Sequence, residues 1–299
     1  MNPLVHIGYH KTGSTWLQES FFPVHSGFTL LLSHHEIFEL LAKPNALEFD
    51  SAVARGVLDA AIANVENGAV PVISSEILSG SPLAGGRESK DLAERIHGSI
   101  PNARILVVIR EQRAALASLY KQYVSSGGVG SMRDFFSPPV AYSYSWFDPR
   151  HYQYASLVAC YLRLFGPKRV KVLLYEQLRK HPEDFIREIE VFSGASRQNV
   201  SCIQMEAVHK SLSGVATSVL RFANRFERSP SNPTPIVSII GLRKIARALL
   251  TRIDSIGLDG AGDKRLREFV SRRFRGAFSD SNRNLEKLTG LDLRDYGYE

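Results

Sequence analysis

Residues 6–18 read HIGYHKTGSTWLQ, and this stretch decides the fold of the chain. It opens at the end of a short apolar run typical of a strand, turns between Gly8 and Gly13, and becomes helical from Ser14. A glycine turn between a strand and a helix N-terminus binds phosphate groups, because its backbone N–H groups and the positive end of the helix dipole face the anion. Lys11 adds an ammonium group inside the turn, so the stretch predicts a phosphate-binding loop.

The order of residues in this loop separates it from the loop of nucleoside-triphosphatases. The motif of those enzymes is G-x-x-x-x-G-K-[ST], with the lysine directly after the second glycine. Here Ser14 follows Gly13, and the lysine lies inside the loop at position 11. Thr12, Ser14 and Thr15 add hydroxyl donors beside it. Residues 11–16, Lys-Thr-Gly-Ser-Thr-Trp, resemble the 5′-phosphosulfate loop of sulfotransferases, which use 3′-phosphoadenosine 5′-phosphosulfate (PAPS).

A second candidate anion site begins at Arg110, directly after the most apolar run of the chain, residues 104–109. An arginine at the carboxyl end of a strand lies where ligands bind in open α/β sheets, and its planar guanidinium suits a phosphate. Ser118 follows eight residues later, close to two helical turns. Sulfotransferases hold the 3′-phosphate with an arginine and a serine at this spacing, so the resemblance assigns Arg110 and Ser118 to that phosphate. Gln112 departs from the pattern, because many members have proline there.

The resemblance also assigns roles in sulfuryl transfer, in which an acceptor oxygen attacks sulfur in line while a phosphate oxygen leaves. Lys11 should stabilise the negative charge that develops on the bridging oxygen. Glu76, just after the apolar run Ala69–Ser74, stands where carbohydrate sulfotransferases place their general base. His10, the neighbour of Lys11, is the other candidate for the base.

The remaining contacts to the nucleotide follow from the same resemblance. The 5′-phosphate should be bound by four consecutive loop residues, Thr12, Gly13, Ser14 and Thr15. Trp16 matches a tryptophan that stacks on adenine. A third contact to the 3′-phosphate usually comes from a late basic loop, for which the sequence offers Lys210 and Ser211 without a clear match to either known form.

Two further segments are similar to sulfotransferases. Residues 172–178, VLLYEQL, and the helix that follows to Gly194 look like a strand and helix segment of the family, in which we expect Tyr175 and Glu176 to be structural. The tail between residues 281 and 298 is similar to the ending of many bacterial members.

Two other functions fit parts of the sequence. A P-loop kinase would transfer phosphoryl groups from ATP, but such an enzyme needs a strand-end carboxylate to hold magnesium. The apolar runs end in no aspartate, and the strand-end carboxylates are Glu76 and Glu176. A basic nucleotide- or RNA-binding protein would suit the net charge of +7. No recognisable nucleic-acid motif is present, so nucleic acid is not an expected partner.

The pattern of apolar residues predicts an α/β fold. The chain of 299 residues is 44% hydrophobic and 22% charged, which is ordinary for a globular protein. Strands and helices alternate in its first part, as in a three-layer, P-loop-NTPase-like parallel sheet flanked by helices. The expected strands are Pro3–Ile7, Phe28–Leu32, Ala69–Ser74, Arg104–Ile109, which should be central in the sheet, and Val170–Tyr175. The expected helices are Ser14–Phe22, Ser51–Asn67, Lys90–Gly98, Gln112–Ser125 and Pro182–Ser193.

Strand signals fade after about residue 196, and helical patterns follow. The expected helices are Ser213–Arg228, Val237–Arg252, Asp263–Phe274 and Ser281–Leu288, with a proline-rich loop at 229–235. We expect a single sulfotransferase domain over residues 1–299, with an α/β nucleotide-binding core at 1–195 and a mainly helical C-terminal cap at 196–299.

Cysteines and histidines predict no metal site. Cys160 and Cys202 form no Cys-x-x-Cys pair, and the remaining histidines lack ligand spacing. A sulfuryl group carries less charge than a terminal phosphoryl group, so the reaction should need no metal. No apolar run approaches the roughly 20 residues of a membrane span, and no signal peptide precedes the first strand. Because animal Golgi sulfotransferases carry an N-terminal anchor, we expect a cytoplasmic enzyme of bacterial type.

The acceptor is expected to be a hydroxyl on a carbohydrate or glycolipid, with a small-molecule natural product as the alternative. An aromatic-rich stretch could stack on a sugar ring or pack in the core; it contains Tyr142, Tyr144, Trp146 and Tyr152. Two basic helical patterns, at 221–228 and 243–252, suit contact with an anionic acceptor or an anionic surface. A solvated basic face is the favoured explanation for most of those charges.

Overall fold

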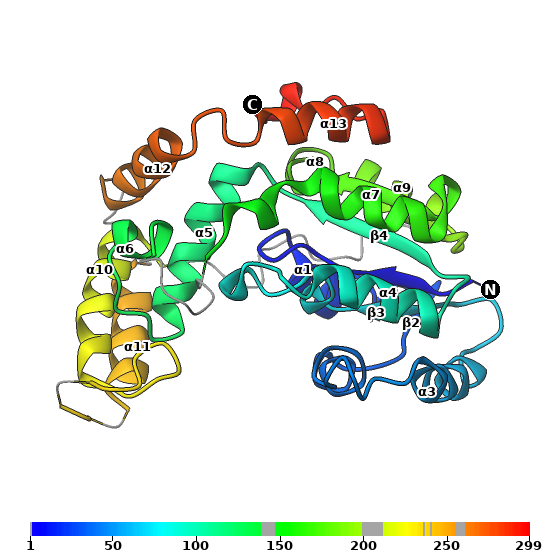
Figure 1. Ribbon diagram of the computed structural model, residues 1–299, viewed down its shortest axis with the longest axis horizontal. Helices are drawn as coiled ribbons and strands as arrows, with labels where there is room; N and C mark the ends of the chain where they lie inside the picture. The colour runs from blue at the N-terminus through cyan, green and yellow to red at the C-terminus, as the bar shows by residue number, and fades with distance from the viewer. Residues whose placement is uncertain (1, 139–146, 199–211, 236, 240, 255–260) are drawn as a thin grey trace.

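The computed structural model describes residues 2–138, 147–198, 212–235, 237–239, 241–254 and 261–299, and the side chains of 251–254 and 261 are not described. These residues form a parallel five-stranded sheet in the order β2-β3-β1-β4-β5 (Figure 1). The strands are β1 (Leu4–His6), β2 (Phe28–Leu30), β3 (Val70–Ser74), β4 (Arg104–Ile109) and β5 (Val170–Leu174). The predicted α/β class with a parallel sheet is confirmed.

The position of β4 corrects one expectation. This strand was expected at the centre because it is the most apolar, but β1 occupies the centre and β4 lies between β1 and β5. Both strands are buried on both faces, so their apolar composition cannot tell the two inner positions apart. The central place of β1 puts the loop at residues 8–13 between the ends of β3 and β4, the two strands that pair with β1.

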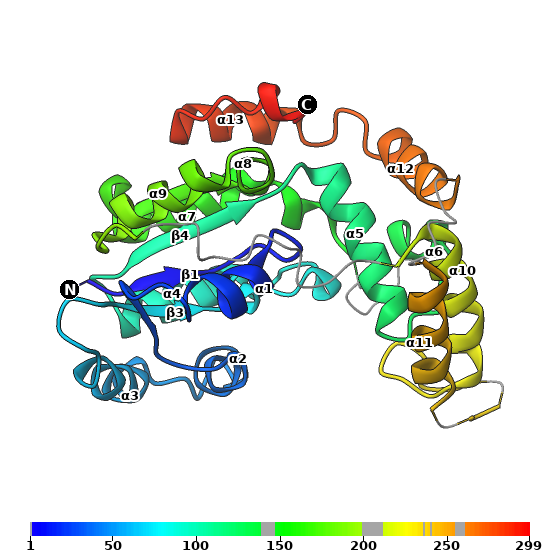
Figure 2. The same cartoon turned by 180° about the vertical axis from the view of Figure 1, so that it is seen from behind.

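Helices connect the strands and cover both faces of the sheet (Figures 1 and 2). Up to β5 the longer ones are α3 (Ser51–Ala63), α4 (Ser89–Ser99), α5 (Gln112–Ser125) and α7 (Tyr154–Phe165). The shorter ones are α1 (Ser14–Trp16), which continues as η1 (Leu17–Phe21), α2 (His34–Ile37), η2 (Phe38–Ala42), η3 (Glu76–Ser79), η4 (Pro82–Ala84), α6 (Met132–Phe136), η5 (Pro149–Tyr152) and η6 (Pro167–Arg169). After β5 come α8 (Tyr175–Lys180), α9 (Pro182–Ser193), α10 (Gly214–Ala223), η8 (Asn224–Phe226), α11 (Leu242–Asp254), α12 (Ala261–Arg273), α13 (Ser279–Thr289) and η9 (Arg294–Tyr296).

The two faces of the sheet build two separate hydrophobic clusters, because successive side chains of a strand point to opposite sides. On β4, Ile105 and Val107 pack into the cluster that contains residues of α4 and α7. Leu106 and Val108 pack into the cluster that contains residues of η1 and α9. The alternation confirms the three layers of helix, sheet and helix that the sequence predicts.

The predicted helices before residue 196 are present, and Gln112–Ser125 and Pro182–Ser193 have the predicted bounds. Sequence analysis did not predict α7, whose residues include Leu157, Val158 and Cys160. This helix packs on β4 and β5 on one side and on α13 on the other.

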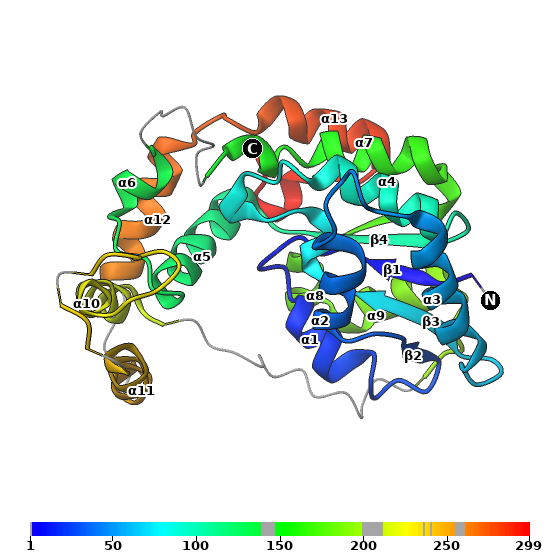
Figure 3. The same cartoon turned by 60° about the horizontal axis from the view of Figure 1, so that its bottom comes forward.

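The segment after residue 196 is helical as expected, but it divides into two parts (Figure 3). Helices α10 and α12 pack on α5, beyond the sheet, and α11 packs on α10. Gly214 and Gly262 let α10 and α12 approach closely, since a Cβ on Gly214 would lie 2.2 Å from the backbone of Gly262. Lys121 of α5 also pairs with Asp263 of α12 at 2.6 Å. Helix α13 instead returns to α7, so the division at residue 196 stays a prediction.

Helices α10 and α11 carry apolar side chains on their outer surfaces. Val215, Val219 and Phe222 are exposed on α10, and Ile245 and Leu249 are exposed on α11. In the part of the chain that the structure describes, no helix has the length and apolar character to cross a lipid bilayer.

Candidate active site

The loop after β1 turns sharply because three of its residues adopt left-handed backbone conformations. The φ angle is +81° at Gly8, +66° at Lys11 and +89° at Gly13. Among the described residues, Lys11 alone adopts a positive φ without being glycine, which is a strained conformation found most often at functional sites. A Cβ on Gly8 would lie 2.8 Å from Cα and Cβ of Glu76, so this glycine lets the loop approach the end of β3.

Two hydroxyl groups close the loop on itself. The Thr12 hydroxyl donates to the carbonyl oxygen of Tyr9 at 2.5 Å, and the Ser14 hydroxyl donates to the same oxygen at 3.3 Å. Both side chains are buried, whereas Thr15 is half-buried and Lys11 is exposed. The buried hydroxyls therefore shape the loop. Because Gly13 caps the helix without a side chain, the backbone N–H groups of its first turn are suited to an anion.

Trp16 lies in the core rather than at the surface of the loop. Its ring stacks on Phe21, with ring centroids 5.6 Å apart, and 6% of the residue is exposed. It belongs to the hydrophobic cluster that contains Leu17 and Phe185. The ring therefore contributes to the core, and its expected stacking on adenine stays a prediction.

Lys11 and Arg110 meet across the end of the sheet. The Arg110 guanidinium Nη1 donates to the carbonyl oxygen of Lys11 at 3.2 Å. Desolvation and the charge of Arg110 lower the pKa of the Lys11 ammonium, while Glu76 acts in the opposite direction. Two cations from different strands thus lie close together beside backbone N–H donors, which is an arrangement that favours a multiply charged anion.

Glu76 follows β3 and lies directly against the loop. Gln18 Nε2 donates to Glu76 Oε2 at 3.0 Å and to the carbonyl oxygen of Ser74 at 3.3 Å, so it holds the carboxylate in place. Burial alone would raise the pKa of the Glu76 carboxyl, but His10, a backbone donor, Gln18 and His34 outweigh burial and lower that pKa. The carboxylate is therefore ionised at neutral pH and able to accept a proton.

His10 lies between Glu76 and the aromatic residues behind the loop. Burial lowers the pKa of His10 to about 4, with smaller contributions from the charges of His34 and Lys11 and against the opposing charge of Glu76. Its Nδ1 is buried and makes no hydrogen bond to the part of the chain that the structure describes. Both the Glu76 carboxylate and the His10 imidazole are therefore unprotonated at neutral pH, and the choice of Glu76 over His10 as proton acceptor stays a prediction.

Aromatic side chains hold Arg110 from two sides. Its guanidinium lies over the ring of Tyr175, 4.7 Å from the ring centroid. The hydroxyl of Tyr154 donates to the backbone carbonyl oxygen of Arg110 at 2.7 Å. A Cβ on Gly13 would lie 3.4 Å from the Tyr175 ring, so the same ring also packs under the loop. Tyr175 is therefore structural, as expected, and links the two candidate anion sites.

Glu176 fastens the segment after β4 to the chain terminus. Its Oε1 accepts a hydrogen bond from the backbone N–H of Glu111 at 3.0 Å, and its Oε2 accepts one from the Tyr298 hydroxyl at 3.1 Å. The Glu111 carboxylate in turn accepts bonds from the backbone N–H groups at the start of α5. Both carboxylate oxygens of Glu176 thus accept hydrogen bonds from protein groups, which gives this residue a structural role as well.

Gln112, the position that departs from the family pattern, has a polar partner from the tail. Its Nε2 donates to Asn282 Oδ1 at 2.5 Å, and Asn282 Nδ2 donates to the backbone oxygen of Glu299 at 2.7 Å. A proline at 112 could not make this bond. Sequence analysis missed Gln18, Tyr154, Asn282 and Tyr298 as supporting residues, because nothing in their local patterns shows which distant group they meet.

The other predicted site residues are placed as follows. Ser118 is half-buried on α5, at the expected spacing from Arg110. Lys210 and Ser211 lie outside the described residues, as do Cys202, His209, Tyr142, Tyr144 and Trp146. Tyr152 is buried against Tyr9 and packs in the core. Within the described ranges, no group of three or more His, Cys, Asp or Glu side chains is arranged to hold a metal ion.

Comparison with known proteins fits this geometry. The family model described as "Sulfotransferase domain" matches residues 2–227, which include the loop, Glu76, Arg110 and Ser118. The chain belongs to the sulfotransferase-domain family. The fold of this sulfotransferase is similar to the crystal structure of a sulfotransferase from Alicyclobacillus acidocaldarius, with 18% identity, a TM-score of 0.53 and coverage of 99% of each chain.

Two more solved structures are similar at lower scores. One is mouse sulfotransferase SULT7A1 complexed with PAP, with 13% identity, a TM-score of 0.37 and coverage of 96% of this sulfotransferase and 88% of that chain. The other is the sulfotransferase domain from the curacin biosynthetic pathway, with 12% identity, a TM-score of 0.42 and coverage of 92% and 98%. A comparison with curated protein sequences finds no significant match.

Proposed function

We propose that this sulfotransferase transfers the sulfuryl group of PAPS to a hydroxyl of a carbohydrate or glycolipid, with Glu76 as the general base. The observation that carries the proposal is the meeting of three groups at one edge of the sheet. A strained lysine loop, an ionised carboxylate at the end of β3 and a guanidinium at the end of β4 come from three adjacent strands. They supply the donor site, the base and the second anion site of one reaction.

The nucleotide is held at both of its anionic ends. The backbone N–H groups at the start of α1, Lys11 and the Thr15 hydroxyl bind the 5′-phosphosulfate, while the buried Thr12 and Ser14 hydroxyls keep the loop in shape. Arg110 and Ser118 bind the 3′-phosphate, with Lys210 and Ser211 as the third contact. Arg110 is suited to this role because its guanidinium packs on the Tyr175 ring while Tyr154 holds its backbone carbonyl oxygen.

The reaction needs a proton acceptor and a cation at opposite ends of the line of attack. Glu76 takes the proton of the acceptor hydroxyl as its oxygen forms a bond to sulfur. Lys11 stabilises the phosphate oxygen that departs as its bond to sulfur breaks. The products are the sulfated acceptor and 3′-phosphoadenosine 5′-phosphate (PAP). The chain's own residues supply every charge that these steps require, so we propose that no metal ion takes part.

The carbohydrate or glycolipid acceptor is supported by the carboxylate at position 76, since the resemblance places a histidine there in the small-molecule branch. The exposed apolar and basic residues of α10, η8 and α11 support a further proposal, peripheral contact with an anionic surface; among them are Phe222, Arg225, Lys244 and Ile245.

Calorimetry tests the donor. PAP should bind tightly without magnesium, and ATP with magnesium should bind weakly, because Arg110 and Ser118 serve a 3′-phosphate that ATP lacks. A preference for ATP with magnesium would contradict the proposal and favour a kinase. Turnover with PAPS that is lost in Lys11→Ala would exclude a protein that merely binds nucleotides.

A further inference from the structure

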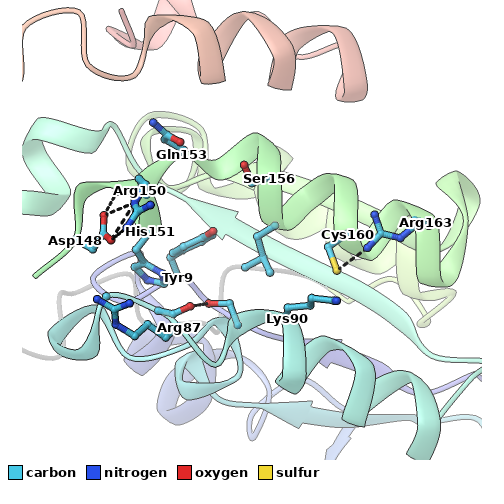
Figure 4. Close-up of a pocket in the computed structure, with 14 residues that line it drawn as sticks. Tyr9, Arg87, Lys90, Asp148, Arg150, His151, Gln153, Ser156, Cys160 and Arg163 are labelled. Atoms are coloured by element: carbon cyan, nitrogen blue, oxygen red, sulfur yellow. Dashed lines mark hydrogen bonds and ion pairs between the residues drawn. The ribbon is translucent and has the colours of Figure 1, made fainter. Parts of the chain in front are cut away.

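A cavity of about 650 Å³ lies on one side of the lysine loop (Figure 4). It runs between the start of α4 and the helices η5 and α7, and its volume is typical of a site for an organic ligand. Residues of the loop, of the η4–α4 connection and of α7 line it: Tyr9, Gly85, Gly86, Arg87, Ser89, Lys90, Asp148, Arg150, His151, Gln153, Ser156, Leu157, Cys160 and Arg163.

The cavity is joined to the reaction centre by two elements. Tyr9 belongs to the lysine loop, and its ring lies 5.0 Å from that of His151, centroid to centroid. The segment that begins with Glu76 continues within ten residues to Gly85 and Gly86, which form a wall of the cavity. A Cβ on Gly86 would lie 2.0 Å from Nδ1 of His151, so this wall closes directly on the residues behind the loop.

Positive charge dominates the lining. Four cationic side chains, Arg87, Lys90, Arg150 and Arg163, face one carboxylate, Asp148. Burial holds the pKa of His151 at about 3, so its imidazole adds no charge at neutral pH. The first turn of α4, which starts at Ser89, adds the positive end of a helix dipole.

The cations already have protein contacts, but these leave the cavity with an excess of positive charge. Asp148 is paired with Arg150 and also lies near Arg87. Lys90 lies 3.6 Å from Glu94 in an exposed pair, and Arg163 donates to the Cys160 sulfur at 3.5 Å. Exposed pairs of this kind contribute little and exchange readily for a ligand. Figure 4 shows Arg87 and Arg150 near Tyr9, and Lys90 and Arg163 toward the other end.

We propose that this cavity binds the acidic part of the acceptor, and that the acceptor is a carbohydrate that carries carboxylate or sulfate groups. The inference rests on the proposed function, because it takes Glu76 and Lys11 as the place where the hydroxyl reacts. The cavity adjoins the lysine loop at Tyr9, so a chain of several sugar residues that reacts at Glu76 would extend over the loop to reach it. Its anionic groups lie against the cations at the two ends, and its hydroxyls meet Ser156 and Gln153.

The test compares two probes that differ in charge alone. One is a tetrasaccharide of alternating glucuronate and N-acetylhexosamine, and the other is the same tetrasaccharide with its carboxylates reduced to hydroxymethyl groups. Binding of each to the PAP complex is measured by calorimetry at low ionic strength, where charge contacts are least screened. The variant is Lys90→Glu with Arg163→Glu, and the control is Lys168→Glu with Arg179→Glu, which makes the same charge change at exposed sites outside the cavity.

The acidic probe should bind at least about tenfold more tightly than the neutral one, and the Lys90→Glu, Arg163→Glu variant should lose this preference while the control keeps it. Equal binding of the two probes, no binding of the acidic probe, or an unchanged preference in the variant would each overturn the inference. PAP affinity of the wild type is measured in the same titrations. Loss of PAP binding there would instead count against the proposed function, so the two failures are distinguishable.

Discussion

The two candidate anion sites are built in opposite ways. The lysine loop holds its shape through contacts within a few residues, such as the bonds from Thr12 and Ser14 to Tyr9. Arg110 is held by groups far away in the chain, Tyr154 and Tyr175, and its neighbour Glu111 is tied through Glu176 to Tyr298. The difference teaches that a phosphate loop can be recognised from local sequence. The position of an arginine at a strand end, by contrast, depends on contacts with residues far away in the chain, including the C-terminal tail.

Substitution of Glu76, whose carboxylate lies beside the lysine loop, should give the largest loss of activity. Glu76→Gln keeps the size of the side chain and removes the group that accepts the proton, so kcat should fall by about 100- to 10,000-fold. PAP affinity should stay nearly unchanged, because Glu76 does not serve the nucleotide. Steady-state kinetics with PAPS and calorimetry with PAP make the measurement, and an active Glu76→Gln enzyme would remove Glu76 from the mechanism.

The locally built loop can be broken at Gly8. In Gly8→Ala the new Cβ would lie 2.8 Å from the Cα of Glu76, and residue 8 would have to keep a φ of +81°. Either the loop or Glu76 must therefore shift. A displacement of about 1 Å at a reacting group costs on the order of 100-fold in kcat.

Gly166→Ala is the matched control for Gly8→Ala, since its φ is +80° and no atom lies within 4 Å of the added Cβ. It should lose comparable backbone stability and keep its kcat. Equal loss of kcat in the two variants would show that backbone strain alone, and not contact with Glu76, explains the effect.

Substitution of Arg110 should distinguish the two candidate anion sites, because it should affect one nucleotide ligand and not another. Arg110→Ala removes the charge-assisted hydrogen bonds that we propose to the 3′-phosphate; bonds of this kind contribute roughly 1.5–3 kcal/mol, so PAP should bind about 10- to 150-fold more weakly. Adenosine 5′-monophosphate lacks that phosphate, and its affinity should change little. Calorimetry with both nucleotides checks the difference, and a parallel loss for both would contradict the assignment of Arg110.

Substitution of Tyr298, which contacts the segment of Arg110 through Glu176 and Glu111, should weaken PAP binding less than substitution of Arg110 itself. Tyr298→Phe removes the hydrogen bond to Glu176, and a single bond of this kind contributes about 0.5–1.5 kcal/mol. We expect PAP affinity to fall by about two- to tenfold, with kcat nearly unchanged. Tyr296→Phe is the control, because the ring of Tyr296 contacts Lys180 and is kept in the variant.

Lowering the pH from 7 to 4.5 should change the activity least of all. The pKa of Glu76 lies below its usual 4.5, and the active form is the ionised one, present above that pKa and lost as the pH falls through it. Activity should therefore fall less than about twofold between pH 7 and pH 4.5. The basic limb should lie below pH 10.5, where the lowered pKa of Lys11 removes its charge. An acid limb well above pH 4.5 would contradict Glu76 as the base.

Sequence patterns predicted the strands to within two residues, because short continuous apolar runs are local signals. They did not place β1 at the centre, because strand order depends on the whole sheet, and they did not predict α7. The same local signals predicted the turn between β1 and α1, which the structure shows, but they did not indicate that the Trp16 ring stacks on Phe21.

The sequence by itself determined the lysine loop, the parallel α/β sheet and the order of Arg110 and Ser118, since these depend on neighbouring residues and fixed spacings. Tertiary structure alone decided how Gln18 holds Glu76, how Tyr298 and Asn282 support the end of β4, and that a basic cavity adjoins Tyr9. The physical reason is that hydrogen bonds and cavities join residues far apart in the chain. Their partners become defined when helices pack on the sheet, which no local pattern records.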